Sequence, residues 1–211
     1  MKRVVAGLLL AGALIFPNAV FAQGPTVDVS GIDVASLKLY MGGQEAVDAL
    51  KAKFGKPVLV NNSGLQANAI RVSTINSKIN PGKTWINNIS YNDGEYEYGA
   101  LFVESVKQGD IRPEAIYCIY VHANPQFTPA QNKQMEESLN QKFGSPTFTV
   151  KSMDYSIDWC GQIQGNFRCD PAKPHASWSR VNLTKSYQLN LIDESFLKNA
   201  VQNYKGQKPN L

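Results

Sequence analysis

Three cysteines and two histidines carry the strongest nucleophilic and metal-binding chemistry in this chain of 211 residues. Cys160 and Cys169 flank the segment 161–168, where two glycines and an asparagine predict a tight hairpin. We expect a disulfide that closes this short loop. Cys118 lies in the apolar run 116–121, which predicts a buried strand and a free thiol. A bridge from Cys118 to either of the other two cysteines stays open at this stage.

The spacing of these residues argues against metal binding and covalent catalysis. No Cys-x-x-Cys or His-x-x-x-His pattern is present, so we predict no metal site. Cys118 and His122 are four residues apart in one predicted strand, about 13 Å along its axis at ~3.3 Å per residue. A catalytic Cys–His pair needs hydrogen-bond contact. We therefore predict no catalytic residues and no cofactor, and a hydrolase with an unrecognised site is the competing class.

Two pairs of neighbouring carboxylates are the remaining candidates for acid–base chemistry. Glycoside hydrolases use two Asp or Glu residues that flank the scissile bond. The candidate pairs are close only in sequence, and a solvated surface is the simpler interpretation. They are Asp154 with Asp158 and Glu95 with Glu97.

Aromatic side chains form a second kind of candidate site. In two predicted strands, 84–91 and 96–106, they recur at every second position and so share a face. Tyr and Trp dominate protein-binding hot spots because they combine a large rigid area with a polar tip. This face is a candidate protein-binding surface, and packing under helices is the other interpretation. Its members are Trp85, Tyr91, Tyr96, Tyr98 and Phe102.

The loop closed by Cys160 and Cys169 is a second candidate binding surface. A stapled loop is preorganised, which lowers the entropy that binding must cost. Structural bracing of the sheet is the other interpretation of this loop. The large or charged side chains in or near the loop are Trp159, Phe167, Arg168 and Trp178.

A repeated segment shows which elements must position these residues. Residues 50–57 recur at 139–146 with Leu, Lys, Phe, Gly and Pro in the same places. In both copies an amphipathic helix ends at Gly, Pro prevents its continuation, and a strand follows. A last helix is predicted from Asp193, which acts as its cap. The expected strands are 69–74, 84–91, 96–106, 115–123, 147–151, 157–160, 176–183 and 187–192.

This order of elements predicts an α+β fold of tandem helix-plus-antiparallel-sheet repeats with a C-terminal helix. The first unit covers residues 23–123 and the second covers 124–205. Residues 206–211 form a polar tail that we expect to be flexible.

The first 22 residues have the features of a signal peptide. Lys2 and Arg3 precede the uncharged apolar run 4–16, Pro17 breaks the run, and Ala22 ends a cleavage motif. We expect cleavage near Ala22 and a periplasmic or secreted protein without stable membrane insertion. The net charge of +4 is too small to indicate a nucleic-acid partner.

The motif around the first helix resembles that of a known group of envelope proteins. Gly31-Ile32, then Leu39-Tyr40-Met41-Gly42, precede a helix that ends in Phe54-Gly55. This order resembles the envelope proteins related to β-lactamase-inhibitor protein and the SmpA/OmlA outer-membrane assembly lipoproteins. Tyr40 stands where those families have Gly, and Gly42 stands where they have a capping Ser or Thr. No cysteine follows the cleavage site, so a lipid anchor of the lipoprotein kind is not expected.

The resemblance implies a helix–sheet protein that binds another protein, with no catalytic residues. The sequence thus predicts an exported protein-binding module, either an envelope accessory factor or an inhibitor of an exported enzyme. Its partner is a protein in the cell envelope or outside the cell. A peptidoglycan or small-ligand binder is the remaining alternative, besides the hydrolase.

Overall fold

A computed structural model describes residues 22–61, 68–78, 80–104, 114–123, 128–150, 155–165, 169–181 and 186–206. Residues 1–21 of the predicted signal peptide and 207–211 of the predicted tail lie outside this part. The helices are α1 (Gly43–Phe54), α2 (Pro129–Phe143) and α3 (Glu194–Gly206). The strands are β1 (Ala22–Gln23), β2 (Val58–Val60), β3 (Ile70–Asn76), β4 (Thr84–Asn92), β5 (Tyr96–Glu104), β6 (Glu114–Ala123), β7 (Phe148–Val150), β8 (Ser156–Cys160), β9 (His175–Val181) and β10 (Ser186–Ile192).

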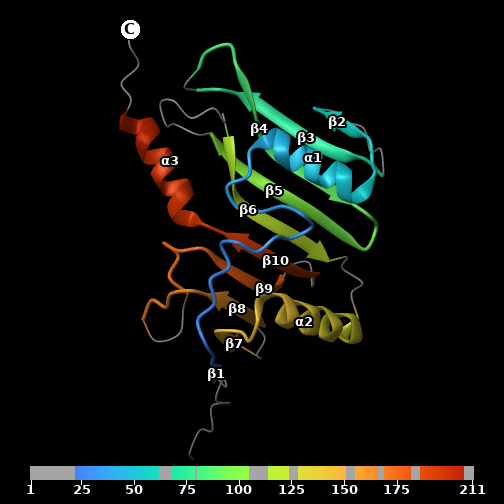
Figure 1. The fold of residues 1–211 in the computed structure, drawn as a ribbon, viewed down its shortest axis with the longest axis vertical. Coiled ribbons are helices and arrows are strands. Elements are labelled where there is room, and N and C mark those ends of the chain that lie inside the picture. The colour runs from blue at the N-terminus through green and yellow to red at the C-terminus, as the bar shows by residue number, and fades with distance from the viewer. Residues whose placement is uncertain are drawn as a thin grey trace, which may run out of the picture.

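All ten strands belong to one sheet, in the order β1-β7-β8-β9-β10-β6-β5-β4-β3-β2 (Figure 1). Neighbouring strands are antiparallel except for the parallel pair β2–β3. β6 and β10 are the last strands of the two halves of the chain, and they pair with each other at the centre of the sheet. The two halves of the chain therefore meet along a single seam between these two strands.

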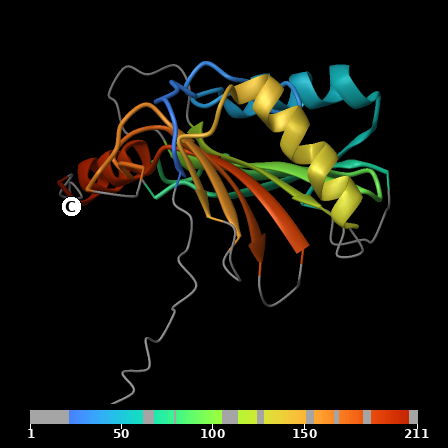
Figure 2. The same cartoon turned by 90° about the horizontal axis from the view of Figure 1, so that it is seen from below.

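Helices α1 and α2 lie on the same side of the sheet, and α3 lies at one end of the strands (Figure 2). The main core lies between the sheet and α1 and α2, and one cross-strand row in it is at most 1% exposed. This row consists of Ile89, Ala100, Ile119, Leu191, Ala176 and Trp159. The α+β class and the C-terminal helix are confirmed. No helix in the described ranges is both long and apolar enough to cross a membrane.

The helix boundaries follow the local sequence. Thr128 caps α2 in a capping box with Gln131, as the Thr-Pro-x-Gln sequence predicts. Gly55 ends α1 in the left-handed region at φ 64°, and its N–H donates to the carbonyl of Lys51 at 2.9 Å. Gly144 ends α2 with φ 85° and ψ −168°, which is a different conformation. Asp193 caps α3, as predicted, by accepting the N–H of Phe196 at 3.0 Å.

The tandem repeat itself is not confirmed. Each half does contribute a helix followed by strands, but the strands after the two helices pair differently. β2 is parallel to its neighbour β3 at one edge of the sheet. β7 is antiparallel to both of its neighbours, β8 and β1. The similar segments 50–57 and 139–146 thus give similar helix ends in unlike sheet contexts.

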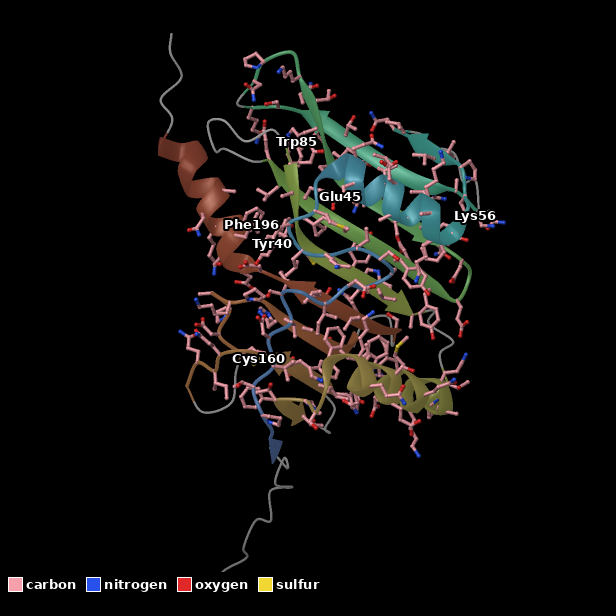
Figure 3. All side chains as sticks on the ribbon, in the orientation of Figure 1. Tyr40, Glu45, Lys56, Trp85, Cys160 and Phe196 are labelled. Atoms are coloured by element: carbon pink, nitrogen blue, oxygen red, sulfur yellow. A yellow bond between two sulfur atoms is a disulfide. The ribbon has the colours of Figure 1, made fainter. Side chains whose placement is uncertain are left out.

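The two departures from the envelope-protein motif are each accommodated by a distant residue. Tyr40 has φ 68°, a conformation that favours glycine, and its hydroxyl donates to Asp193 at 2.6 Å. Figure 3 shows Tyr40 beside Phe196 of α3, with ring centroids 5.1 Å apart. Gly42 offers no side-chain cap to α1, and the buried Glu114 carboxylate accepts the N–H of Gly43 instead. Burial raises the pKa of Glu114.

Candidate functional site

The aromatic face predicted from the sequence packs in part against α1. Tyr91 and Phe102 are each 4% exposed. The Phe54 ring of α1 lies 4.4 Å from Tyr91 and 5.3 Å from Tyr98, measured between centroids. Tyr96 and Tyr98 are half-buried and pack on the same core. Tyr91 and Phe102 are therefore core residues, while a binding role for the half-buried Tyr96 and Tyr98 stays a prediction.

Trp85, the fifth member of that predicted face, does not share it. The pairing of β3 with β4 shifts between Ser73 and Thr74, so that Asn87 is an extra residue in β4. A bulge of this kind reverses the alternation of side chains beyond it. The register consequently places Ile86, and not Trp85, on the face of Ile89.

The predicted disulfide between Cys160 and Cys169 is present. Its neighbours Trp159 and Trp178 are 0% exposed, since they occupy the core face of β8 and β9. Their place in a binding loop is thus corrected to a place in the core. Phe167 and Arg168 lie outside the described residues. The Trp159 indole N–H donates to the carbonyl of Gly144 at 2.9 Å, which ties β8 to the end of α2.

Cys118 is a free cysteine on β6 and is 6% exposed. Burial raises the pKa of its thiol to about 11, which leaves roughly a hundredth of the usual thiolate at pH 8. We predict no reaction of the folded, unreduced protein with Ellman's reagent, and one equivalent after denaturation. A thiol that reacts fast in the folded protein, or more than one equivalent after unfolding, contradicts this assignment.

Part of the opposite face of the sheet carries mostly polar side chains, beside a row on the same face that includes Leu101, Cys118 and Ile192. None of the described helices lies over it (Figure 2). Strand register places the polar residues in two rows across six neighbouring strands, in the sheet order β4, β5, β6, β10, β9 and β8. We call these twelve residues the polar face. The first row is Ser90, Gly99, Tyr120, Asn190, Ser177 and Asp158, and the second is Asn92, Glu97, His122, Gln188, Ser179 and Ser156.

Tyr120 is the largest side chain of the polar face, and its position is fixed by its neighbours. A Cβ on Gly99, in the facing strand, would lie 2.3 Å from the Tyr120 ring carbon Cζ, so the ring covers this glycine. The His122 ring stacks on Tyr120 with centroids 4.7 Å apart. Asn88 donates to the Tyr120 hydroxyl at 3.5 Å. Burial raises the pKa of Tyr120, so its hydroxyl stays protonated at neutral pH.

The close approach at Gly99 predicts that Gly99→Ala lowers the free energy of unfolding by about 1–3 kcal/mol. The new methyl group would also lie 2.8 Å from the carbonyl oxygen of Ile89, which cannot rotate away. Urea unfolding followed by tryptophan fluorescence measures the change. Gly31→Ala is the matched control, because nothing lies within 4 Å of its new Cβ. Equal stability of the two variants would show that the ring does not cover Gly99.

The carboxylates of the polar face are not arranged as a catalytic pair. Glu97 on β5 and Asp158 on β8 are four strands apart, about 19 Å at ~4.8 Å per strand. Glycosidase carboxylates lie within about 10 Å of each other. Glu97 lies 3.9 Å from His122, and both are exposed enough for water to screen the pair. Burial raises the pKa of Asp158, while Ser156 and His175 oppose the shift.

In the predicted pair of Glu95 and Glu97, each carboxylate has a partner of its own. Glu95 accepts a hydrogen bond from Gln131 of α2 at 3.4 Å, whereas Glu97 lies near His122 on the polar face. Asp154 lies outside the described residues. In the described part of the chain, no three His, Cys, Asp or Glu side chains could hold a metal ion.

Comparisons with known proteins give no relative: the chain matches no protein-family model, no curated protein and no solved structure. The resemblance to the envelope families therefore stays a prediction. The sequence did contain a signal for the polar face, since Glu97 and Gly99 alternate with Tyr96 and Tyr98. What it lacked was the pairing of β6 with β10, which joins the polar positions of the two halves.

Proposed function

We propose that this protein is an exported protein-binding module and that the polar face receives its partner. The observation that carries the proposal is a six-strand face of amide, hydroxyl and aromatic side chains that no described helix covers. Strands ~4.8 Å apart make this face about 25 Å wide, and its two rows would form the centre of a specific interface of about 800 Å² per partner.

The chemistry of the polar face supports a protein partner. Antibody binding surfaces are rich in Tyr, Ser and Asn, because Tyr supplies rigid area and Ser and Asn supply adaptable hydrogen bonds. Tyr120 is centrally placed and held by Gly99 and His122, so little side-chain entropy would be lost on binding. The seam between β6 and β10 brings Gln188 and Asn190 directly beside these aromatic rings. We also infer that the two halves are repeated units, each of which supplies one flank of this surface.

Affinity capture tests the proposal. The immobilised protein is exposed to cell-envelope and secreted fractions, alongside Tyr120→Ala and the control Lys133→Ala on α2, whose side chain is 79% exposed. We expect one protein that binds saturably to the wild type and the control. Tyr120→Ala should weaken this binding by about 30-fold or more, as hot-spot truncations do.

A second variant separates lost binding from lost folding. Ser179→Arg adds a large charged side chain to the polar face and removes no core contact. It should abolish capture while the far-ultraviolet circular dichroism stays unchanged. Equal capture by all four proteins, or no protein retained above background, would refute the proposal. If the captured protein is an enzyme whose activity falls on binding, the inhibitor role is supported over the accessory role.

We propose that the protein works in the periplasm or outside the cell. The Cys160–Cys169 disulfide supports this location, because disulfides persist in oxidising compartments. We predict that the mature chain begins near Gln23, which pairs with Phe148 in the edge strand β1. Intact mass spectrometry of the exported protein checks this start. A mass that includes residues 1–22 would contradict removal of the signal peptide.

A further inference from the structure

A cavity of about 180 Å³ lies on the helix side of the sheet, away from the polar face. Its floor consists of four side chains from β5, β6, β9 and β10, and α2 forms one wall. The floor residues are Tyr98, Val121, Trp178 and Leu189. The space is half open to solvent, so it is a groove between α2 and the sheet and not a closed void.

The polar groups around the cavity are already engaged by other parts of the chain. The Ser138 hydroxyl donates to the carbonyl of Gln134 at 2.9 Å. Lys142 pairs with Asp33 at 3.3 Å. The Trp178 indole N–H donates to Asn132 at 2.8 Å. Lys142 keeps spare N–H donors only at the exposed rim, and a charged group deeper in the space would lose its hydration without gaining a partner. The floor of the lining therefore selects for an uncharged apolar group.

The size of the space and the aromatic rings in its lining narrow the class of ligand further. A dry protein cavity of about 150 Å³ lined by aliphatic and aromatic side chains binds benzene. The aromatic rings of Tyr98, Phe143 and Trp178 all contribute to the lining here. Aromatic rings attract one another in edge and offset arrangements beyond their burial of area. We propose that this cavity is a binding site for one small uncharged aromatic molecule of one or two fused rings.

The cavity can be entered from solvent at the side of α2. Ser138 and Lys142 line it and are exposed, whereas Leu139 between them is 5% exposed. Ser138 therefore marks the entrance, and a larger apolar residue there would fill the space from outside. Leu at this exposed helical position keeps the buried side chains unchanged and is favoured by helix propensity.

Titration with fluorobenzene, followed by fluorine NMR of the probe, tests the site on the purified protein. We expect saturable binding of one molecule per chain. Ser138→Leu should weaken the affinity by about tenfold or more, because a packed interior does not expand to admit both. The control Gln141→Leu adds the same side chain to an exposed position of α2 outside the lining and should change the affinity less than twofold.

Two further measurements make the outcome decisive. 4-Fluorobenzoate should bind more weakly than fluorobenzene, because its carboxylate would lose hydration and Lys142, the cation of the described lining, already pairs with Asp33. Tyr120→Ala should leave fluorobenzene binding unchanged, so that failure of this site and failure of the polar face are separable. The proposal is overturned by the absence of saturable binding, by equal loss in both leucine variants, or by tighter binding of 4-fluorobenzoate. The first of these results would favour a side chain of a partner protein as the occupant.

Discussion

Trp178→Ala is expected to lower the free energy of unfolding by about 3–5 kcal/mol, the usual cost of truncating a buried tryptophan. Trp178 is 0% exposed at the centre of the β9 core face. Its ring stacks on Tyr187 at 5.6 Å between centroids, with 11° between the ring planes. The variant also removes the hydrogen bond to Asn132, whose side chain is buried. Since domains of this size are stable by only about 5–15 kcal/mol, the variant should be close to unfolding at room temperature.

Urea unfolding followed by circular dichroism measures this loss, because removal of a tryptophan alters the fluorescence signal itself. Trp178→Phe keeps a ring in the core and should lose less stability than Trp178→Ala. Lys133→Ala, at an exposed position of α2, should stay within about 0.5 kcal/mol of the wild type. If Trp178→Ala unfolds at the same urea concentration as Lys133→Ala, Trp178 is not a core residue, and the sequence-based place in a binding loop returns.

Local elements were predictable because short segments decide them. The capping box at Thr128, the cap at Asp193 and the disulfide at Cys160 each depend on residues within about ten positions. In each case a particular side chain satisfies backbone groups or closes a loop, whatever the rest of the chain does. The α+β class follows from the order of these elements.

The sequence did not predict which face of the sheet the helices cover. Both faces of β5 carry apolar or aromatic residues, so alternation alone does not show which face the helices cover. The Tyr98 face is buried because Phe54 arrives from α1, more than 40 positions earlier in the chain. Bulges at Asn87 and Tyr117 then shift the alternation within β4 and β6. A bulge depends on the facing strand, and periodicity within one strand cannot locate it.

The candidate site was the least predictable part of the structure, because it combines strands from both halves of the chain. His122 and Gln188 are neighbours only because β6 pairs with β10, across 66 positions of sequence. The antiparallel strands β3–β6 and β7–β10 are joined through β6 and β10. The same local patterns allow several other strand orders, so the sequence does not select this one. Sequence reasoning therefore predicted a Tyr-bearing sheet face, but it could not identify the face that the two halves of the chain form together.

Asp193→Ala is expected to cost about 2–4 kcal/mol of unfolding free energy, because one carboxylate both caps α3 and binds the Tyr40 hydroxyl. It caps α3 through the N–H of Phe196, and loss of a cap costs about 1 kcal/mol. It also accepts the Tyr40 hydroxyl at 2.6 Å, and hydrogen bonds to a charged group contribute about 1.5–3 kcal/mol. Its own N–H donates to the carbonyl of Tyr117 at 2.9 Å, which keeps the carboxylate at the end of β6.

The pH dependence of this loss has a definite sign. Burial by itself raises the pKa of Asp193, but hydrogen bonds from Tyr40, Ser195 and the N–H of Phe196 outweigh it and hold the pKa below 3.8. The folded state therefore binds this proton less readily than the unfolded state, and the carboxylate stabilises the fold above about pH 4. The difference in stability between the wild type and Asp193→Ala should be full at pH 6 and should shrink as the pH falls below 3.8.

A double-mutant cycle with Tyr40→Phe isolates the bond between the N-terminal segment and α3. Tyr40→Phe removes only the hydroxyl and keeps the ring against Phe196, so it should cost less than Asp193→Ala. The two changes should be non-additive by about 0.5–3 kcal/mol, since they remove the same hydrogen bond. Strict additivity, or a loss in Asp193→Ala that does not change between pH 6 and pH 3, would show that Asp193 acts as a neutral helix cap alone. Strict additivity would also mean that no hydrogen bond offsets the left-handed backbone conformation of Tyr40.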